Sequence, residues 1–457
     1  MKAALSMVII SSMFAGCGGK SDETDACEDN DLFDENRVLQ VNISMNNDEW
    51  NALRQQSRSI TGEFVGDCRS GPFESSYTYF PASIEIDDQS AANIGIRKKG
   101  FIGSQSTEKP GFRINLDEYV DDTKLFCTDN ITLNNAVQDP SLMRQCLSYK
   151  VFRDAGIKAP RCNFARVSMN GEDLGIYVNV EPVKKKFLRE NFGDDEGDLY
   201  EGTITDFARN WYSTFEEKTD ETDATLSSIR SVIDDLETSS EDLETILERH
   251  FDLDRLLTFL SAEIWTGHWD GYAGNQNNFF VYKDPETDKF KFIPWGTDGT
   301  MIWEDAEDAF PSRGYLANRI LRDEGLAYQW YERIGELRGG AWNTETLLAE
   351  VDRIEELLNS EIEMDELKDE INGLRNFIEQ REDSIKSMLP VRTIEEFSNP
   401  ACMVENGSID ATFSTVWSNA QPDQIDAIIE SGEAEINISW RDGVEETDLN
   451  LAESGAF

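Results

Sequence analysis

The chain has 457 residues, and its 90 acidic residues outweigh its 42 basic residues to give a formal net charge of −48 at pH 7. A field this acidic opposes binding to nucleic acid, where cationic side chains must replace the counterions of the phosphates, so we expect no nucleic acid among its partners. With only two His and no Cys-x-x-Cys pair, the sequence gives no sign of a zinc site.

Residues 1–19 are predicted to be a targeting segment. Lys2 provides a positive start, and the apolar run from Ala3 to Phe14 is too short to span a bilayer. The following Phe14-Ala15-Gly16-Cys17 resembles the lipobox of bacterial lipoproteins, so Cys17 is the expected lipidation site. The protein is then expected to be exported and anchored through acyl chains to the bacterial envelope, at the outer membrane or cell surface. An ordinary signal peptide that is cut nearby is the alternative.

Residues 20–35 are acidic and rich in turn-forming residues, which predicts a flexible tether. Apart from Cys17, an even number of cysteines remains, and in an exported chain this favours disulfides. These cysteines are Cys27, Cys68, Cys127, Cys146, Cys162 and Cys402, and the sequence does not determine their pairing.

The remaining chain mixes strand-like and helical patterns, which predicts an α+β fold. We expect a domain at 36–390, with a β-rich part at about 36–200 and a helical part at about 201–390, followed by a small β-rich region at 391–457. The expected strands are 38–45, 77–80, 82–86, 164–169, 174–180, 411–417 and 434–440, with a turn at Asn170-Gly171. The expected helices are 48–53, 183–191, 226–247 and 256–266, with further helical stretches at 311–336 and 344–388.

The stretch 94–116 places basic residues on a predicted strand, a Gly/Ser-rich turn and a second strand. Its candidate nucleotide-binding residues are Arg97, Lys99, Ser104 and Lys109. Glycine lets backbone approach phosphates, and Arg and Lys neutralise their charge, so a basic stretch in this acidic chain favours a polyanionic ligand. The alternative is a plain hairpin with solvated basic side chains.

Two further features lie near the middle of the chain. Asp139 or Ser141 is expected to cap a helix at 142–155, in which Arg144 is interpreted as a helix-surface salt bridge or else a phosphate or ion-pair partner. Glu181 follows a predicted strand and is a candidate ion-pair partner for Lys109, because kinases pair a strand lysine with a nearby acidic residue. A surface charge at a strand end is the other interpretation of Glu181.

The candidate catalytic loop begins at His268. His268-Trp269-Asp270 with Asn275 has the H-x-D-x-x-x-x-N spacing of a protein-kinase catalytic loop, where Asp is the base for the substrate hydroxyl and Asn holds a metal. Because Asn and Asp also favour turns for purely local reasons, a set of structural turns is the alternative.

A predicted hairpin follows this loop. Strands at 278–282 and 289–293 flank Asp284-Pro285, and the second strand runs into Asp298-Gly299. Asp298 is therefore placed like the metal-binding Asp that follows a kinase catalytic loop by one hairpin.

These motifs resemble those of the CotH kinase family. The matches are Trp269-Asp270-Gly271-Tyr272, Asn275, Asn278 to Tyr282, Phe292 to Trp295, Asp298 and Thr300. The stretches 94–116 and 139–167 also resemble family motifs. One departure is Gly296, which stands where the family has the first Asp of Pro-Trp-Asp-x-Asp.

The resemblance implies a two-lobed atypical protein-kinase-like fold with a small C-terminal β appendage. It implies an ATP-dependent kinase for Ser or Thr of secreted or surface proteins, in which Asp270 is the base. Asp298 with Asn275 or Asn278 would hold Mg²⁺ or Mn²⁺. The residues expected to bind the nucleotide are Arg97, Lys99, Ser104, Lys109 and Glu181. Gly296 leaves open a binding or adhesion module with a degraded site, and the acidic pair would also suit a metal-dependent phosphohydrolase or nucleotidyltransferase.

Overall fold

The computed structural model describes residues 32–59, 69–73, 75–209, 211–219, 226–302, 311–389 and 400, together with three strands between 422 and 450. The targeting segment with Cys17 and the strand expected at 411–417 lie outside the described residues. Among the described residues, no helix combines the length and the apolar character needed to cross a membrane.

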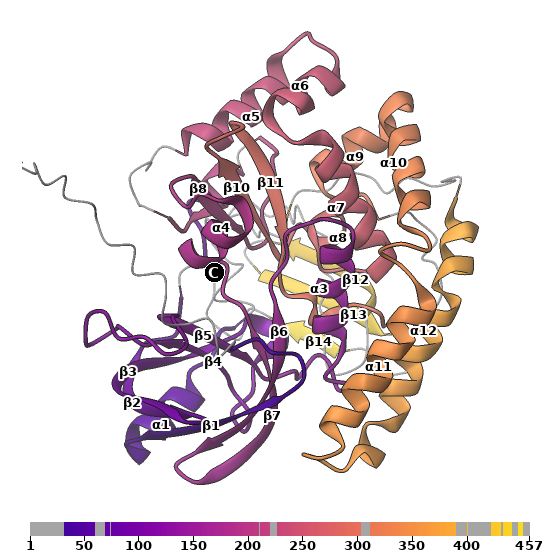
Figure 1. The fold of residues 1–457 in the computed structure, drawn as a ribbon. Helices are drawn as coiled ribbons and strands as arrows, with labels where there is room; N and C mark the ends of the chain where they lie inside the picture. Colours follow the sequence, from indigo (N-terminus) through magenta and orange to yellow (C-terminus); the bar gives the residue numbers. More distant parts are fainter. Residues whose placement is uncertain are drawn as a thin grey trace, which may run out of the picture.

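The N-terminal strands close into a seven-stranded barrel, in the order β1-β2-β3-β4-β5-β7-β6 (Figure 1). Its closing pair is β1 with β6, which run parallel with Val38 opposite Phe164. The strand bounds are β1 (Val38–Met45), β2 (Phe80–Ile86), β3 (Gln89–Lys99), β4 (Gly111–Asn115), β5 (Asn130–Asn134), β6 (Cys162–Met169) and β7 (Glu172–Val180). The strands expected at 77–80 and 82–86 are thus one strand, because β2 continues through Pro81.

Alternating side chains fill the barrel. Leu39, Val41 and Ile43 of β1 are each 1% exposed, while the residues between them face outward. The turn between β6 and β7 is built as expected, because Asn170 and Gly171 adopt φ values of 53° and 84°. Helix α1 (Asn47–Gln55) packs its buried Trp50 against Phe112 of the barrel interior, at 6.1 Å between ring centroids.

The segment Leu32–Glu35 is packed against the fold. Leu32 and Phe33 are buried in the barrel core at 3% and 7% exposure. Arg353 donates a hydrogen bond to the backbone carbonyl of Glu35 at 2.6 Å, which links the segment to the helical part. The tether expected at 20–35 therefore does not extend over these last residues.

A four-stranded sheet lies beside the barrel in the order β11-β10-β8-β9. Its strands are β8 (Asp198–Gly202), β9 (Glu216–Glu217), β10 (Phe279–Asp284) and β11 (Lys289–Pro294), and helix α4 (Lys185–Phe192) precedes it. The expected hairpin is the β10–β11 pair, in which Phe279 lies opposite Pro294. Buried aromatic rings, including Phe279, Phe290 and Phe292, pack this sheet onto the helices.

Helices form most of the remaining described structure (Figure 1). They are α5 (Ser227–Thr238), α6 (Leu243–His250), α7 (Leu253–Thr266), α8 (Tyr272–Asn275), α9 (Tyr315–Arg322), α10 (Glu324–Leu337), α11 (Thr344–Leu358) and α12 (Lys368–Met388). The single helix expected at 226–247 is two helices. The first ends at Thr238, and Asp242 caps the start of the second, since its side chain accepts a hydrogen bond from the Thr245 backbone at 2.8 Å.

Helix α3 (Arg144–Asp154) packs between the barrel and the helical part. Asp139 caps it by accepting a hydrogen bond from the Arg144 backbone at 2.8 Å. Arg144 is only 5% exposed. Its guanidinium forms one ion pair with Asp139 at 3.1 Å and another with Glu370 of α12 at 3.2 Å. The interpretation of Arg144 as a surface salt bridge is therefore wrong, because its ion pair with Asp139 is buried, and the interpretation as an ion-pair partner matches the structure.

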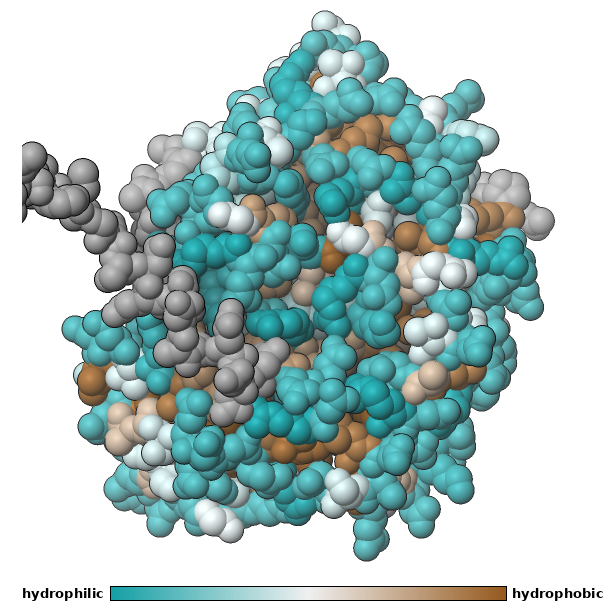
Figure 2. All heavy atoms as spheres, in the orientation of Figure 1, coloured by the Kyte–Doolittle hydropathy of each residue, from teal (hydrophilic) through white to brown (hydrophobic). Residues whose placement is uncertain are grey.

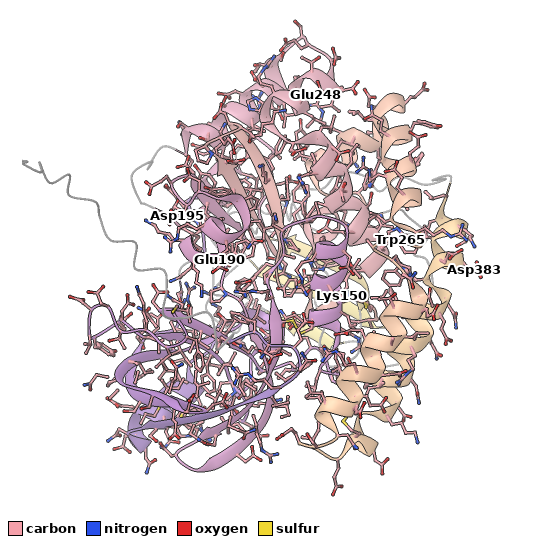
Figure 3. All side chains as sticks on the ribbon, in the orientation of Figure 1. Lys150, Glu190, Asp195, Glu248, Trp265 and Asp383 are labelled. Carbon is pink, nitrogen blue, oxygen red and sulfur yellow. A yellow bond between two sulfur atoms is a disulfide. The ribbon has the colours of Figure 1, made fainter. Side chains whose placement is uncertain are left out.

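Disulfides tie the fold together, as the cysteine count predicted. One joins Cys146 of α3 to Cys162 of β6, and Cys127 is also disulfide-bonded. Figure 3 shows Lys150 of the same helix at the junction of the barrel and the helices.

The described part of the C-terminal region is a three-stranded antiparallel sheet of β12 (Pro422–Glu430), β13 (Glu433–Trp440) and β14 (Thr447–Asn450). The strand expected at 434–440 is β13.

Hydrophilic atoms cover most of the face shown in Figure 2. In Figure 3 the labelled Asp195, Glu248 and Asp383 lie toward the edges of the molecule, as expected for a chain of this net charge.

Candidate active site

The loop between α7 and β10 carries Asp270. Helix α7 ends at Gly267, whose φ of 61° turns the chain out of the helix. The hairpin then returns the chain to the same place, because the Trp295 backbone donates a hydrogen bond to the Asn278 carbonyl at 3.1 Å. Asp298 follows in a short 3₁₀ turn, Thr297–Gly299, close enough for its charge to act on the Asp270 carboxyl. The two predicted acidic residues are thus brought together.

Three side-chain amides surround the half-buried Asp270 carboxyl. Asn275 donates to Oδ1 at 2.7 Å, and Asn278 and Asn277 donate to Oδ2 at 2.7 and 3.2 Å. Burial raises the pKa of Asp270 to about 7, the nearby charge of Asp298 acts in the same direction, and the amide hydrogen bonds oppose it. A carboxyl with such a pKa can exchange a proton with a hydroxyl group near neutral pH.

Asn275 and Asn278 were predicted to hold metal, and both lie at the predicted site. Their amide nitrogens donate hydrogen bonds to the Asp270 carboxylate, so both side chains orient the candidate base. Asn277 has the same role and was missed, although the run Asn275-Gln276-Asn277-Asn278 was visible in the sequence.

Asp298 fits a cation ligand. The side chain is 8% exposed, and its Oδ2 accepts a hydrogen bond from Asn134, at the end of β5, at 3.2 Å. No hydrogen bond joins its Oδ1 to any described residue, which leaves one carboxylate oxygen for a hard cation. The described residues contain no group of three or more His, Cys, Asp or Glu placed to hold a metal, so a cation here would need amide, phosphate or water oxygens as its other ligands.

Gly296 makes room for Asn278. Its φ is 51°, and a Cβ at this position would collide with the amide group of Asn278. Because Asn278 also donates to the Asp270 carboxylate, the glycine and the orientation of the candidate base are linked. The departure from the family motif therefore has a local packing role.

The barrel contributes cations to the same site. Burial lowers the pKa of Lys99 at the end of β3, and the charges of Asp298 and Glu201 oppose that effect. Arg97 lies opposite Arg113 in the β3–β4 ladder, and both act on the Lys99 ammonium. The alternation of β3 turns the intervening Lys98 away, where its Nζ donates to the Arg54 and Gln56 carbonyls at the end of α1 at 3.0 and 2.8 Å.

Other cations here had no sequence signal, because they come from separate segments. Burial lowers the pKa of Lys184 to about 8, with Arg113 as the next cause, and its Nζ donates to Asn130 at 2.7 Å. Lys218 pairs with Glu201 at 2.6 Å. We call Arg97, Lys99, Arg113, Lys184 and Lys218 the cation cluster.

Lys109 and Glu181 do not form the expected pair. The Lys109 Nζ lies over the Tyr177 ring, 5.1 Å from its centroid, and burial lowers its pKa to about 8. Glu181 instead pairs with Arg161 at 2.6 Å and also accepts a hydrogen bond from the Arg161 backbone at 3.0 Å. Lys109 precedes β4 at the barrel end, so its side chain joins the aromatic interior and not the cation cluster.

Ser104 lies in the glycine-rich turn that links β3 to β4. Asn135 holds this turn by donating to the carbonyls of Ser104 and Lys109 at 2.9 and 2.8 Å. Since Asn134 beside it donates to Asp298, the end of β5 connects the predicted phosphate turn to the predicted metal residue.

The fold and the site define an α+β protein with paired carboxylates opposite a cluster of cations. A family profile described as "CotH kinase protein" matches residues 96–386, which is more than half of the chain. The chain belongs to this family.

The individual relatives have low sequence identity to this chain. "Inner spore coat protein H" of Bacillus subtilis (strain 168) is 29% identical over 181 residues, covering 37% of this chain and 49% of that protein. "Spore coat protein homolog 1" of Rhizopus delemar is 22% identical over 328 residues, covering 65% and 50%, and "Invasin CotH2" of the same fungus is 22% identical over 268 residues, covering 52% and 45%. The chain thus spans about half the length of these relatives.

Among solved structures, the chain is similar to the "Helicobacter pylori proinflammatory kinase CtkA", with 10% identity and a TM-score of 0.31 over 64% of this chain and 95% of that one. This likeness is too remote to establish the fold.

Proposed function

We propose that this protein is an ATP- and metal-dependent kinase that phosphorylates Ser or Thr of secreted or surface proteins. The observation that carries the proposal is the place of Asp298, whose charge acts on both the Asp270 carboxyl and Lys99 of the cation cluster. Phosphoryl transfer requires little covalent chemistry from the protein, and it is accelerated mainly by positioning and by charge stabilisation. This arrangement offers both.

In this proposal the barrel serves as the smaller lobe of an atypical two-lobed kinase and the helical part as the larger one. Asp270 orients the acceptor hydroxyl and takes its proton as the oxygen attacks the γ-phosphorus. The bond from the γ-phosphorus to the bridging oxygen of ADP breaks, and ADP leaves with the electron pair. The amides of Asn275, Asn277 and Asn278 keep the carboxylate aimed during this step.

The cation cluster would bind the triphosphate. Lys99 is the stronger candidate for a phosphate contact than Lys109, because its ammonium lies near Asp298 while that of Lys109 faces Tyr177. Mg²⁺ or Mn²⁺, held by Asp298 with Asn275 or Asn278, would neutralise charge on the phosphates. The pairing of Lys218 with Glu201 would keep one cation at the rim of the site.

The relatives named as spore coat proteins and invasins support a place outside the cytoplasm and an acceptor protein at the surface. Lipid anchoring through Cys17 at the bacterial envelope remains a part of the proposal. The same names favour the alternative, a surface binding module on this fold without phosphotransfer.

The test is protein labelling from γ-labelled ATP with Mn²⁺ or Mg²⁺, comparing the wild type with Asp298→Ala. We expect labelling of the protein itself or of an added acceptor, and we expect Asp298→Ala to abolish both the labelling and the metal-dependent rise in melting temperature on adding ATP. Asp284→Asn is the matched control, because Asp284 is a buried carboxylate at the far end of the same hairpin.

Each alternative has its own result. Phosphate release without protein labelling would identify a phosphohydrolase, and transfer of label from α-labelled ATP would identify a nucleotidyltransferase. Absence of both labelling and any nucleotide-dependent stabilisation would identify a binding module.

A further inference from the structure

A buried carboxylate outside the recognised motifs contacts the catalytic loop. Glu263 lies in the last turns of α7 and is 2% exposed. Its Oε1 accepts a hydrogen bond from the Tyr272 backbone at 2.7 Å, and its Oε2 accepts one from the Ala273 backbone at 2.9 Å. The Glu263 carbonyl also accepts a hydrogen bond from the His268 backbone at 2.9 Å. One residue thus holds the loop on both sides of Asp270.

The two amides belong to the first turn of α8, where backbone N–H groups have no partner within the helix. Such groups are ordinarily capped by the side chain that precedes the helix, but that residue is Gly271 and has no side chain to offer. Glu263 supplies the acceptors from a different helix. The loop therefore depends on α7 for hydrogen bonds that it cannot make itself.

Gly271 makes this contact possible. A Cβ at Gly271 would collide with Oε1 of Glu263, so only glycine lets the loop backbone approach the carboxylate this closely. The contact with α7 therefore explains why glycine follows Asp270 in the sequence. Burying a carboxyl group is costly without such partners, and burial raises the pKa of Glu263 to about 8 while the two backbone hydrogen bonds oppose the rise.

We propose that Glu263 is the residue that positions the catalytic loop, by fixing the backbone of residues 268–273 so that the Asp270 carboxylate faces the acceptor site. Asparagines hold the Asp270 side chain from the β10 side, and Glu263 holds its backbone from the α7 side. The catalytic consequence rests on the proposed function, whereas the positioning itself does not.

Hydrogen exchange of single backbone amides tests the positioning without any assay of activity. In the wild type, the amides of Tyr272 and Ala273 are expected to be protected. Glu263→Gln offers one acceptor oxygen and turns an NH₂ group toward the other amide, so exchange at these residues should accelerate about tenfold or more while the barrel keeps its protection. Asp284→Asn, the matched control, should leave the loop amides unchanged.

Gly271→Ala is a second variant that keeps the carboxylate and pushes the loop away from it. It should accelerate exchange at the same two amides. Unprotected amides in the wild type, or unchanged protection in both variants, would overturn the proposal.

Kinetics separates positioning from general destabilisation. In Glu263→Gln, kcat should fall about a hundredfold while the KM for ATP changes less than about threefold, because a base misplaced by about 1 Å loses rate and the cation cluster is untouched. Glu263→Asp, which keeps the carboxyl group on a shorter side chain, should recover part of kcat. An equal change in kcat and KM would overturn the positioning role. A wild type without phosphotransfer whose loop amides respond as described would refute the proposed function and leave the positioning intact.

Discussion

The two sides of the site hold their charged groups in different ways. On the helical side, Asp270 is surrounded by neutral amides, and the nearby charge of Asp298 adds to the effect of burial in raising its pKa. On the barrel side, Lys99 lies among other cations, with Glu201 and Asp298 as the opposing charges. Burial brings the pKa of the Asp270 carboxyl close to neutrality and so lets it take a proton, whereas crowded cations gain from an added anion. In the proposed function, this difference gives proton transfer to one side and phosphate binding to the other.

Removing the base should have the largest effect. Asp270→Asn should lower phosphotransfer about 10²- to 10⁴-fold, because a positioned general base contributes that much. ATP binding should survive, since the cation cluster is contributed by other segments. Labelled-ATP transfer and nucleotide-dependent melting temperature, measured on the same preparation, would check this. Equal loss of binding and transfer would mean that the two sides do not divide the work as described.

Two lysines of the β3–β4 hairpin should behave differently. Lys99→Ala should weaken ATP binding about 10- to 100-fold, because a hydrogen bond to a charged group contributes about 1.5–3 kcal/mol. Lys109→Ala is its matched control and should change the affinity less than about threefold while lowering stability by about 0.5–2 kcal/mol, the range of a cation–π contact. Calorimetric titration with ATP and denaturant unfolding separate the two effects. A stronger loss of affinity in Lys109→Ala would restore the sequence-based assignment.

The pH dependence should follow the helical side. Only deprotonated Asp270 can accept the hydroxyl proton, so with a pKa of about 7 the rate should rise as the pH increases through neutrality. Asn277→Ala removes a hydrogen bond that stabilises the carboxylate, so the acidic limb of the kcat/KM profile should move to higher pH by about one pH unit or less. A limb that stays in place, or moves to lower pH, would exclude Asp270 as its origin.

Restoring the family residue should have the smallest effect, and a negative one. Gly296→Asp should lower transfer several-fold and cost about 1–2 kcal/mol, because a side chain at this left-handed position is strained and displaces Asn278 from Asp270. Gly296→Ala should show the same displacement without an added charge. The readouts are transfer rate and melting temperature, and a large gain in Gly296→Asp would instead show that the natural site is impaired.

The sequence by itself determined the features whose signals are local. The strand at 38–45, the Asn170-Gly171 turn, and the order of Asp270, hairpin and Asp298 follow from alternation, turn chemistry and spacing, which need no distant partner. The break between α5 and α6 also has a local signal, the capping residue Asp242, but the amphipathic pattern on both sides of it favoured one continuous helix.

Only the tertiary structure decided the contacts between distant segments. The barrel closes through residues 38 and 164, and the first turn of α8 is capped from α7 by Glu263. Lys218, which follows β9, pairs with Glu201 of β8. The β3–β4 hairpin shows the reason most directly. Successive side chains of a strand face opposite sides, so the choice of Lys99 over Lys98 or Lys109 depends on which face the barrel turns inward, and that is fixed by pairing over the whole chain.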